Sequence, residues 1–293
     1  MGHPSFRLLS RLSLLVALLS GGLAVAPAHA QFVYTDTSVG YRWGDNFKEP
    51  GIGKPGTDGT NIEKSIVSLT HSDGYKYGEN FINIDALFSN AADPANHSTQ
   101  GATEVYAVYR HNLSMNAVTG TEMFKYGLLR DLRFELGGDF NTKNTAFAPE
   151  KRLLVFGPNF ALDIGQFFNI GLHYAEEWNN NGIVGKSVAF DPTFELEIAY
   201  GIPFHVAGIR LKYEGFANVV APKGKDGFGA QTVTEFLWHS KLKYDLGQAL
   251  IQKEHLLDVG LGFEYWLNKF GNDHNLVPGS QAYTPFVFAQ VYF

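Results

Sequence analysis

The sequence predicts an all-β fold: a transmembrane antiparallel β-barrel of about 12 strands, with short periplasmic turns and longer extracellular loops. Apolar and charged residues alternate with a period of two in one segment after another, and long polar connections alternate with mostly shorter ones. The chain has 14 Tyr, 24 Phe and 32 Gly, yet its mean hydropathy is only −0.11. A barrel combines these properties because each strand is apolar toward lipid and polar toward the lumen.

Residues 1–30 are expected to be a cleaved signal peptide. Arg7 and Arg11 precede an apolar run, and Ala28 and Ala30 form the small-x-small pattern that signal peptidase recognises. A membrane anchor is the alternative. However, a Ser-Gly-Gly sequence interrupts the run, which is shorter than the ~20 apolar residues that a spanning helix needs. The chain is therefore expected to be exported to the outer membrane of a Gram-negative bacterium.

The expected mature domain, residues 31–293, is acidic and contains no cysteine. The full chain has 23 Lys and Arg against 29 Asp and Glu, and two of the basic residues belong to the signal segment. An acidic balance disfavours nucleic acid as a partner, because proteins that bind nucleic acid present basic surfaces. The lack of cysteine excludes a disulfide scaffold and any thiolate metal site.

Twelve segments have the alternation expected of strands. They span 34–44, 62–71, 76–89, 103–114, 124–140, 151–164, 168–179, 190–203, 206–220, 231–246, 254–270 and 281–293. Segments rich in Gly, Asn and Pro, such as 45–61 and 90–102, alternate with mostly shorter connections. An even strand number with this order of connections is typical of outer-membrane barrels. Two connections, 115–123 and 245–253, fit this alternation of long and short connections least well.

The two faces separate most clearly in the eighth expected strand. Phe194, Leu196 and Ile198 fall on one face, and Glu195 and Glu197 fall on the other. A helix would distribute these charges around its circumference, whereas a strand sorts them. Such charges would be costly in the core of a soluble sandwich, but they suit a hydrated pore. The same sorting places further residues outward: Leu132, Phe134, Leu136, Ile209, Leu211, Tyr213, Phe236, Trp238, Leu242, Leu257, Val259, Leu261 and Phe263.

The last strand reads "YTPFVFAQVYF" and carries no charge. Pairing of this strand with the first one would leave no unpaired edge in lipid. A C-terminal Phe293 after alternating apolar residues also resembles the signal that the barrel assembly machinery recognises in outer-membrane proteins. The final strand of a soluble β domain is the alternative interpretation.

Several short motifs resemble cofactor-binding or catalytic patterns. Gly51, Gly53 and Gly56 match a dinucleotide-binding pattern, but Pro55 and the lack of a following helix leave no helix N-terminus for a pyrophosphate. The segment is therefore expected to be a loop.

Neighbouring residues on a strand point to opposite faces, which disfavours two further motifs. His71, Ser72 and Asp73 are adjacent, whereas the members of a catalytic triad converge in space; they are expected to open a turn. Glu176 and Glu177 diverge likewise and are expected at a solvated rim. The ten histidines have no metal-ligand spacing, so no catalytic residue, cofactor or metal is predicted. A barrel enzyme with Ser, His and acidic side chains converging at a rim is the remaining enzymatic alternative.

Three segments in the N-terminal third carry a resemblance to a known family: "YRWGDNFKEPG" at 41–51, "LTHSDGYKYGENFINID" at 69–85 and "EVYAVYRHNLS" at 104–114. They resemble the Tsx-type nucleoside-specific channel-forming proteins of Gram-negative outer membranes, a superfamily that also includes the vibrio phage-receptor porin. The resemblance implies a monomeric twelve-stranded barrel with a narrow lumen that passes nucleosides. The closing strand shares the resemblance, elsewhere in the chain it is mainly one of pattern, and the family's substrate-contacting residues are not matched one by one.

A nucleoside channel needs aromatic faces for stacking and ionisable side chains for hydrogen bonds, in sites weak enough to release the solute. Strand parity places both kinds of residue on the expected lumen face. The candidate substrate-contacting residues are Tyr106, Arg110, Arg133, Glu135, Glu195, Arg210, Phe216, Asp258, Glu264 and Trp266. Packing of the lumen by crossed Arg–Glu pairs is the alternative role of each.

The sequence thus predicts a channel for passive, substrate-selective diffusion of nucleosides or similar small polar solutes, surrounded by outer-membrane lipids. The alternative is a narrow or closed barrel that acts as a surface receptor, adhesin or structural envelope protein. In that case a phage or colicin would bind loops such as 45–61, 90–102 and 271–282.

Overall fold

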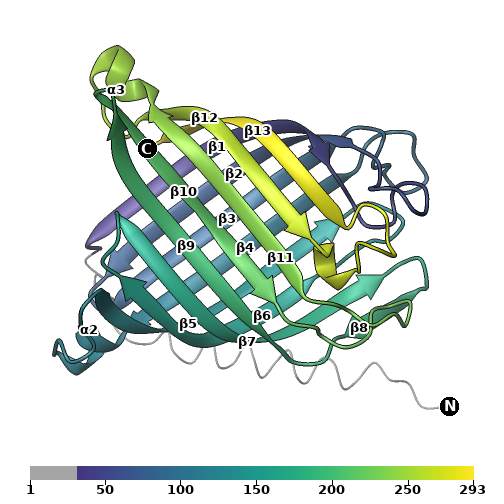
Figure 1. Cartoon of the computed structure of the whole chain (residues 1–293), viewed down its shortest axis with the longest axis horizontal. Coiled ribbons are helices and arrows are strands. Elements are labelled where there is room, and N and C mark those ends of the chain that lie inside the picture. Colours follow the sequence, from purple (N-terminus) through teal and green to yellow (C-terminus); the bar gives the residue numbers. More distant parts are fainter. Residues whose placement is uncertain (1–31) are drawn as a thin grey trace, which may run out of the picture.

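The computed structural model describes residues 32–293, which form a closed antiparallel barrel of twelve strands (Figure 1). Consecutive strands pair with one another, and the pairing of β1 with β13 and of β6 with β7 completes the ring. This confirms the predicted fold class and strand number. The expected signal segment, residues 1–30, lies outside the described residues.

The barrel strands lie close to the predicted ranges. They are β1 (Tyr34–Phe47), β2 (Ile62–Tyr75), β3 (Gly78–Ser89), β4 (Thr103–Ser114), β5 (Leu129–Lys143), β6 (Arg152–Leu162), β7 (Phe167–Asn181), β9 (Thr193–Val206), β10 (Ile209–Val220), β11 (Glu235–Asp245), β12 (Leu257–Leu267) and β13 (Gln281–Tyr292). A further strand, β8 (Lys186–Ala189), extends one hairpin by pairing with the end of β7.

Two short helices occupy the segments that fitted the turn pattern least well. Helix α2 (Met115–Thr119) begins where the Ser114 hydroxyl accepts a hydrogen bond from the Ala117 amide. Helix α3 (Leu246–Ile251) begins where the Asp245 carboxylate accepts one from the Gln248 amide. These N-caps satisfy amides that a first helical turn leaves unpaired. No helix in the described part of the chain is long and apolar enough to span a membrane.

The two ends of the barrel differ (Figure 1). At one end, here called the short-turn end, brief connections and the helices α2 and α3 join the strands. At the other, the long-loop end, every connection is longer than the brief turns 76–77, 163–166 and 207–208. The connections at the long-loop end are 48–61, 90–102, 144–151, 182–192, 221–234 and 268–280, the last containing the 3₁₀ turn η1 (Lys269–Gly271).

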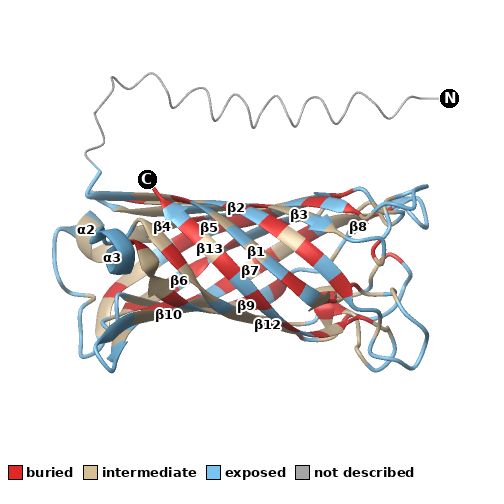
Figure 2. Cartoon of the chain, turned by 90° about the horizontal axis from the view of Figure 1, so that it is seen from above, coloured by how far each residue is buried: buried red, intermediate tan, exposed pale blue. Residues whose placement is uncertain are grey.

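The barrel has a polar interior and an apolar exterior, and Figure 2 shows buried and exposed residues alternating along its strands. On β9, Phe194 points outward and is 70% exposed, whereas Glu195 points inward and is 2% exposed. The same parity holds on β5, where Phe134 and Leu136 are exposed and Glu135 is buried. The predicted assignment of faces is therefore confirmed for these strands, because a one-residue slip would have inverted it.

A small apolar group lies inside the long-loop end. Phe47, Ile62 and Ile66 are buried together, and Ile52 of the first long loop packs against them. The register of β1 against β2 shifts between Gly44 and Phe47, which turns Phe47 inward. This irregularity attaches the loop 48–61 to the inner wall.

Candidate functional site in the barrel lumen

The candidate site is the polar lining of the lumen at mid-barrel. Nine of the ten predicted site residues face the lumen, as their parity requires: Tyr106, Arg110, Arg133, Glu135, Glu195, Phe216, Asp258, Glu264 and Trp266. Arg210, by contrast, lies at the short-turn rim. Its side chain is 55% exposed and donates to Glu254 at 3.0 Å, so it does not join the mid-barrel groups.

Arg110 on β4 connects one side of the lumen. It is 5% exposed, and its Nη1 donates to Asp139 Oδ1 at 2.7 Å. Its Nε donates to Glu197 Oε2 at 3.0 Å, although β5, β6 and β7 separate the two strands. Glu135 Oε1 lies 3.4 Å away. One guanidinium thus joins carboxylates from two distant parts of the ring, which only a lumen-facing side chain can do.

His173 on β7 belongs to the same group, although it was not among the predicted site residues. Its Nε2 lies 3.5 Å from Glu135 Oε2, which also accepts a hydrogen bond from Asn159 Nδ2. Glu135, His173 and Glu197 together bring three metal-ligating side chains within reach of one another. Their positions along the chain could not show this, because each comes from a different strand.

An aromatic stack lines another part of the lumen at mid-barrel. The rings of Phe216 and His239 are stacked with centroids 5.4 Å apart, and His239 and Phe286 are stacked at 5.0 Å. Phe288 continues the series, with Lys241 Nζ 5.4 Å from its centroid. Phe216 is 36% exposed although it points inward, so it presents ring surface to the lumen. Phe216 is one of the predicted site residues, whereas His239 was not predicted.

Part of the charged group lies across the lumen from the aromatic stack, whereas its Glu197, on β9, lies on the strand next to Phe216 of β10. In the circular strand order, β4 is opposite β11 and β6 is opposite β13. Arg110 and Glu135 belong to the first wall, and His239 and Phe286 belong to the second. Each lies at least four residues from either end of its strand. The lumen therefore has a flat aromatic side and a hydrogen-bonding side at similar depth.

Near the long-loop end, Glu49 of the first loop lies among three lysines. Lys64 donates to it, Lys269 Nζ lies 3.3 Å from Glu49 Oε1, and Lys143 Nζ lies 3.4 Å from the same atom. Burial alone would raise the pKa of Glu49, but the attraction of Lys143, Lys269 and Lys64 outweighs burial and holds that pKa well below its ordinary value. Burial lowers the pKa of Lys269 despite its contact with Glu49.

Trp266 and Glu264 lie on the lumen face of β12. Trp266 Nε1 donates to Glu235 Oε1 at 2.7 Å, and Lys269 Nζ is 4.3 Å from the Trp266 ring. Glu264 Oε2 lies 3.3 Å from His239 Nδ1. These contacts connect the aromatic stack to the charged network below the long loops.

The short-turn end of the lumen contains another ion network. Tyr292 donates its hydroxyl hydrogen to Asp258 Oδ2 at 2.8 Å and accepts from Lys243 Nζ at 2.6 Å. Lys243 also donates to Glu214 at 2.9 Å. Arg133 pairs in the same way with Glu79 of β3. Asp258 and Arg133, both predicted as candidates, therefore have bonded partners at this end rather than at mid-barrel.

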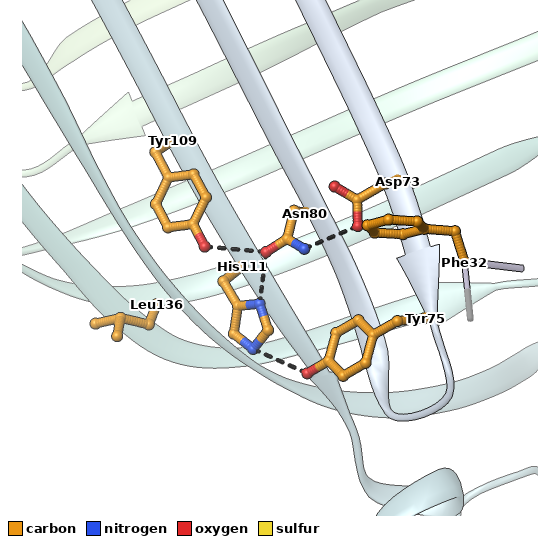
Figure 3. Close-up of a pocket in the computed structure, with 7 residues that line it drawn as sticks. All are labelled: Phe32, Asp73, Tyr75, Asn80, Tyr109, His111 and Leu136. Atoms are coloured by element: carbon orange, nitrogen blue, oxygen red, sulfur yellow. Dashed lines mark hydrogen bonds between the residues drawn. The ribbon is translucent and has the colours of Figure 1, made fainter. Parts of the chain in front are cut away.

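An outward pocket of about 410 Å³ lies on the barrel wall near the short-turn end (Figure 3). Asn80 donates to Asp73 and accepts from the Tyr109 hydroxyl, and its carbonyl oxygen also lies 2.9 Å from His111 Nδ1. Ser72 has the opposite parity on β2 and faces the lumen, so it cannot join this group. Asp73 and His111 both line this pocket, but the hydroxyl groups that line it belong to Tyr75 and Tyr109 and not to a serine.

The structure also tests three motif interpretations. The segment 51–56 is a loop, as predicted. The expected turn at 71–73 is wrong, because β2 continues to Tyr75. Glu176 and Glu177 diverge as predicted, with Glu176 accepting from Tyr174, but the expected solvated rim is wrong for Glu177. It is 6% exposed and bonded to Lys223 Nζ at 2.5 Å.

Comparison with known proteins finds similarity of shape alone. No family model matches the chain, and no curated protein matches it. The KdgM porin has 9% identity and a TM-score of 0.41, covering 87% of this chain and 99% of its own. The NanC porin has 9% identity and a TM-score of 0.44, covering 88% and 99%. The translocator domain of the autotransporter NalP from Neisseria meningitidis has 10% identity and a TM-score of 0.43, covering 97% and 96%.

Proposed function

We propose that the protein is an outer-membrane channel for the passive, selective diffusion of nucleosides or similar small polar solutes. The observation that carries this proposal is the pairing of an aromatic wall with a hydrogen-bonding wall at mid-barrel. Phe216 offers an exposed ring on one side. Among the carboxylates that contact Arg110, Glu197 is 16% exposed and offers an acceptor to the lumen.

A nucleoside matches these two walls chemically. Its base is flat and stacks on aromatic rings, and its ribose hydroxyls donate to carboxylates. Stacking contributes about 1–3 kcal/mol per base in single-stranded nucleic-acid complexes. A site of that strength selects the solute without retaining it, which passage through a channel requires.

A membrane location is supported by the outer wall of the barrel. Large apolar side chains cover it, with Val67, Phe134 and Leu172 each more than 40% exposed. Such a surface is unstable in water and suits a lipid environment, and the closed ring of strands leaves no edge unpaired there. By the usual arrangement of such barrels, the long loops would lie outside the cell and the short-turn end in the periplasm.

Planar-bilayer conductance tests the proposal. Adenosine and thymidine are titrated against a salt current, with glucose as the control solute. We expect saturable block by the nucleosides alone. Phe216→Ala should weaken this block by about tenfold, the loss of one stacking contact. The matched control Phe194→Ala, an outward residue on the adjacent strand, should leave it unchanged. Equal block by glucose, or equal effects of the two variants, would contradict nucleoside selectivity.

A second candidate function is a closed barrel that serves as a surface receptor for a phage or colicin. The position of Glu49 favours it, because its buried contacts with Lys64, Lys143 and Lys269 hold the loop 48–61 against the inner wall. A folded barrel that carries no current in the same bilayer would support this function over the channel.

A further inference from the structure

We infer that the lumen contains a binding site for a divalent cation of the zinc type, formed by Glu135, His173 and Glu197. One ligand atom of each side chain lies within 4.8 Å of the others. The residues come from β5, β7 and β9 and lie at mid-barrel. The inference stands on the geometry of these residues, and zinc binding is measured without any solute, although Glu197 is also the acceptor invoked in the proposed function.

Unpartnered buried atoms point to a missing ligand. The His173 side chain is 0% exposed, yet neither of its ring nitrogens has a hydrogen-bond partner. Glu135 Oε1 is also buried and accepts no hydrogen bond, although Arg110 Nε lies 3.4 Å from it. Unpaired polar atoms are rare in protein interiors because each one loses its hydration without compensation. A cation bound to His173 and Glu135 satisfies an atom of each.

The spacing of the ligand atoms suits a small tetrahedral ion. Zinc bonds of about 2.1 Å place neighbouring ligand atoms roughly 3.4 Å apart. His173 Nε2 and Glu135 Oε2 are already 3.5 Å apart. The Glu197 side chain is 16% exposed, so this side of the site opens to the lumen. Three protein ligands and one water from the lumen complete the coordination.

Two glycines make room for the site. A Cβ on Gly171 would lie 2.4 Å from His173 Nε2, so the imidazole lies directly over this glycine. Gly171 is also the register partner of Glu197. Because the His173 ring lies over Gly171, it lies next to the Glu197 carboxylate. Gly157 lies on β6, between β5 and β7, and is the register partner of Glu135. Because it has no side chain, nothing from β6 separates Glu135 from His173 at this position.

The surrounding charge favours a second cation beside Arg110. Its guanidinium contacts Asp139, Glu135 and Glu197. Glu195 faces the same side and pairs in register with His173. Arg110 therefore lies among four carboxylates, and Lys151 adds a further positive charge near Asp139 and Glu195. Arg110 also fixes Glu197 through its Oε2 atom, in the manner of a group that orients a metal ligand.

Zinc titration of the folded barrel tests the inference. The protein is purified in detergent, treated with a chelator, and titrated with Zn²⁺ by isothermal calorimetry near neutral pH. We expect one equivalent to bind. His173→Asn should abolish this equivalent, and Glu197→Gln should weaken it by about tenfold or more. Co²⁺ used as a spectroscopic probe should show a single nitrogen ligand in X-ray absorption.

His239→Asn is the matched control. His239 also lies buried in the lumen beside a carboxylate, Glu264, but belongs to no group of three ligands among the described residues. Its replacement should leave zinc binding unchanged. A different migration of boiled and unboiled samples on a detergent gel verifies that each variant is folded. The inference is overturned if the parent protein binds no stoichiometric zinc, or if His173→Asn binds as much as the parent.

Discussion

Arg110 shows at the scale of one residue how the lumen holds charge without bulk water. Its guanidinium is surrounded by Asp139, Glu135 and Glu197, all from other strands. Buried ions of opposite sign compensate for each other's lost hydration, so each depends on its partners. Removal of Arg110 leaves these carboxylates without the cation that contacts them.

Replacement of Arg110 by Gln should therefore lower the free energy of unfolding by about 3–5 kcal/mol. Arg152→Gln is the matched control, because Arg152 is 67% exposed and its partner Glu150 is 62% exposed. An exposed pair of this kind contributes less than about 1 kcal/mol. Urea unfolding of both variants in detergent, followed by circular dichroism, measures the difference. Equal losses would show that Arg110 has no special role.

Glu49 is the reverse case, a buried anion among cations, and its contribution to the stability of the fold depends on pH. Its pKa is held below the ordinary value of 4.5, so its ionised form stabilises the folded state at higher pH. That stabilisation disappears as the pH falls through the lowered pKa. Glu49→Gln should cost on the order of 3 kcal/mol at pH 7, because Lys64 and Lys269 lose their carboxylate partner and Lys143 retains only Asp93.

The difference between parent and Glu49→Gln should shrink as the pH falls below 4.5, which thermal unfolding at a series of pH values would show. The exposed Glu150→Gln is the control and should show little difference at any pH. A constant difference between parent and Glu49→Gln across this range would argue against an ionised, stabilising Glu49.

At the scale of elements, strand β12 fits its neighbour β13 by lacking side chains at two lumen-facing positions. Gly262 pairs in register with Phe286, and Gly260 pairs with Phe288. The Phe286 ring lies so close that a Cβ on Gly262 would be 2.1 Å from it. The aromatic stack therefore lies flat against the wall because β12 leaves space for it.

Gly262→Ala should disturb this arrangement. The added methyl group forces the Phe286 ring away from the wall, and overpacking of this kind costs about 1–3 kcal/mol. Gly40→Ala is a suitable control, because the nearest atom to a Cβ there is 3.7 Å away. Thermal unfolding compares stability, and nucleoside block in the bilayer reports the position of the ring. Equal tolerance of both changes would show that Phe286 can move freely.

At the scale of the whole molecule, the barrel reverses the usual distribution of polar and apolar residues. Lys64, Glu135 and Lys243 are buried in the lumen, whereas aromatic and aliphatic side chains are exposed on the outer wall. Stability in this arrangement comes from closed strand pairing, ion networks inside and lipid outside, rather than from one large apolar core.

This distribution predicts opposite sensitivities for two adjacent residues. Leu196 faces outward near mid-barrel, and its replacement by Arg should cost about 2–4 kcal/mol in a bilayer. Glu195→Gln, one residue earlier, retains an acceptor for the bond from Asn218 and should cost much less. Reversible urea unfolding in lipid vesicles measures both. A larger loss for Glu195→Gln would show that the two faces are assigned incorrectly.

The sequence was sufficient for the strand number and for the inward or outward direction of Glu195, Phe134 and Phe216, because the period of two depends on local order alone. It was insufficient for His173 and Asn159, whose role depends on which strands become neighbours and with what register. Arg210 had the predicted parity but lies at the rim, since parity gives direction and not depth. Helices α2 and α3 were missed because a few residues and one cap define each.

The contact between β1 and β13 has a consequence for assembly. Ser38 and Gln290 are 252 residues apart in the chain, yet they share a hydrogen bond inside the closed ring. Loop closure over such a distance makes this seam a slow step, whereas neighbouring hairpins form quickly. Until β13 arrives, β1 presents an open edge that can pair with another chain. The edge of β1 must stay covered until then if pairing with other chains is to be avoided.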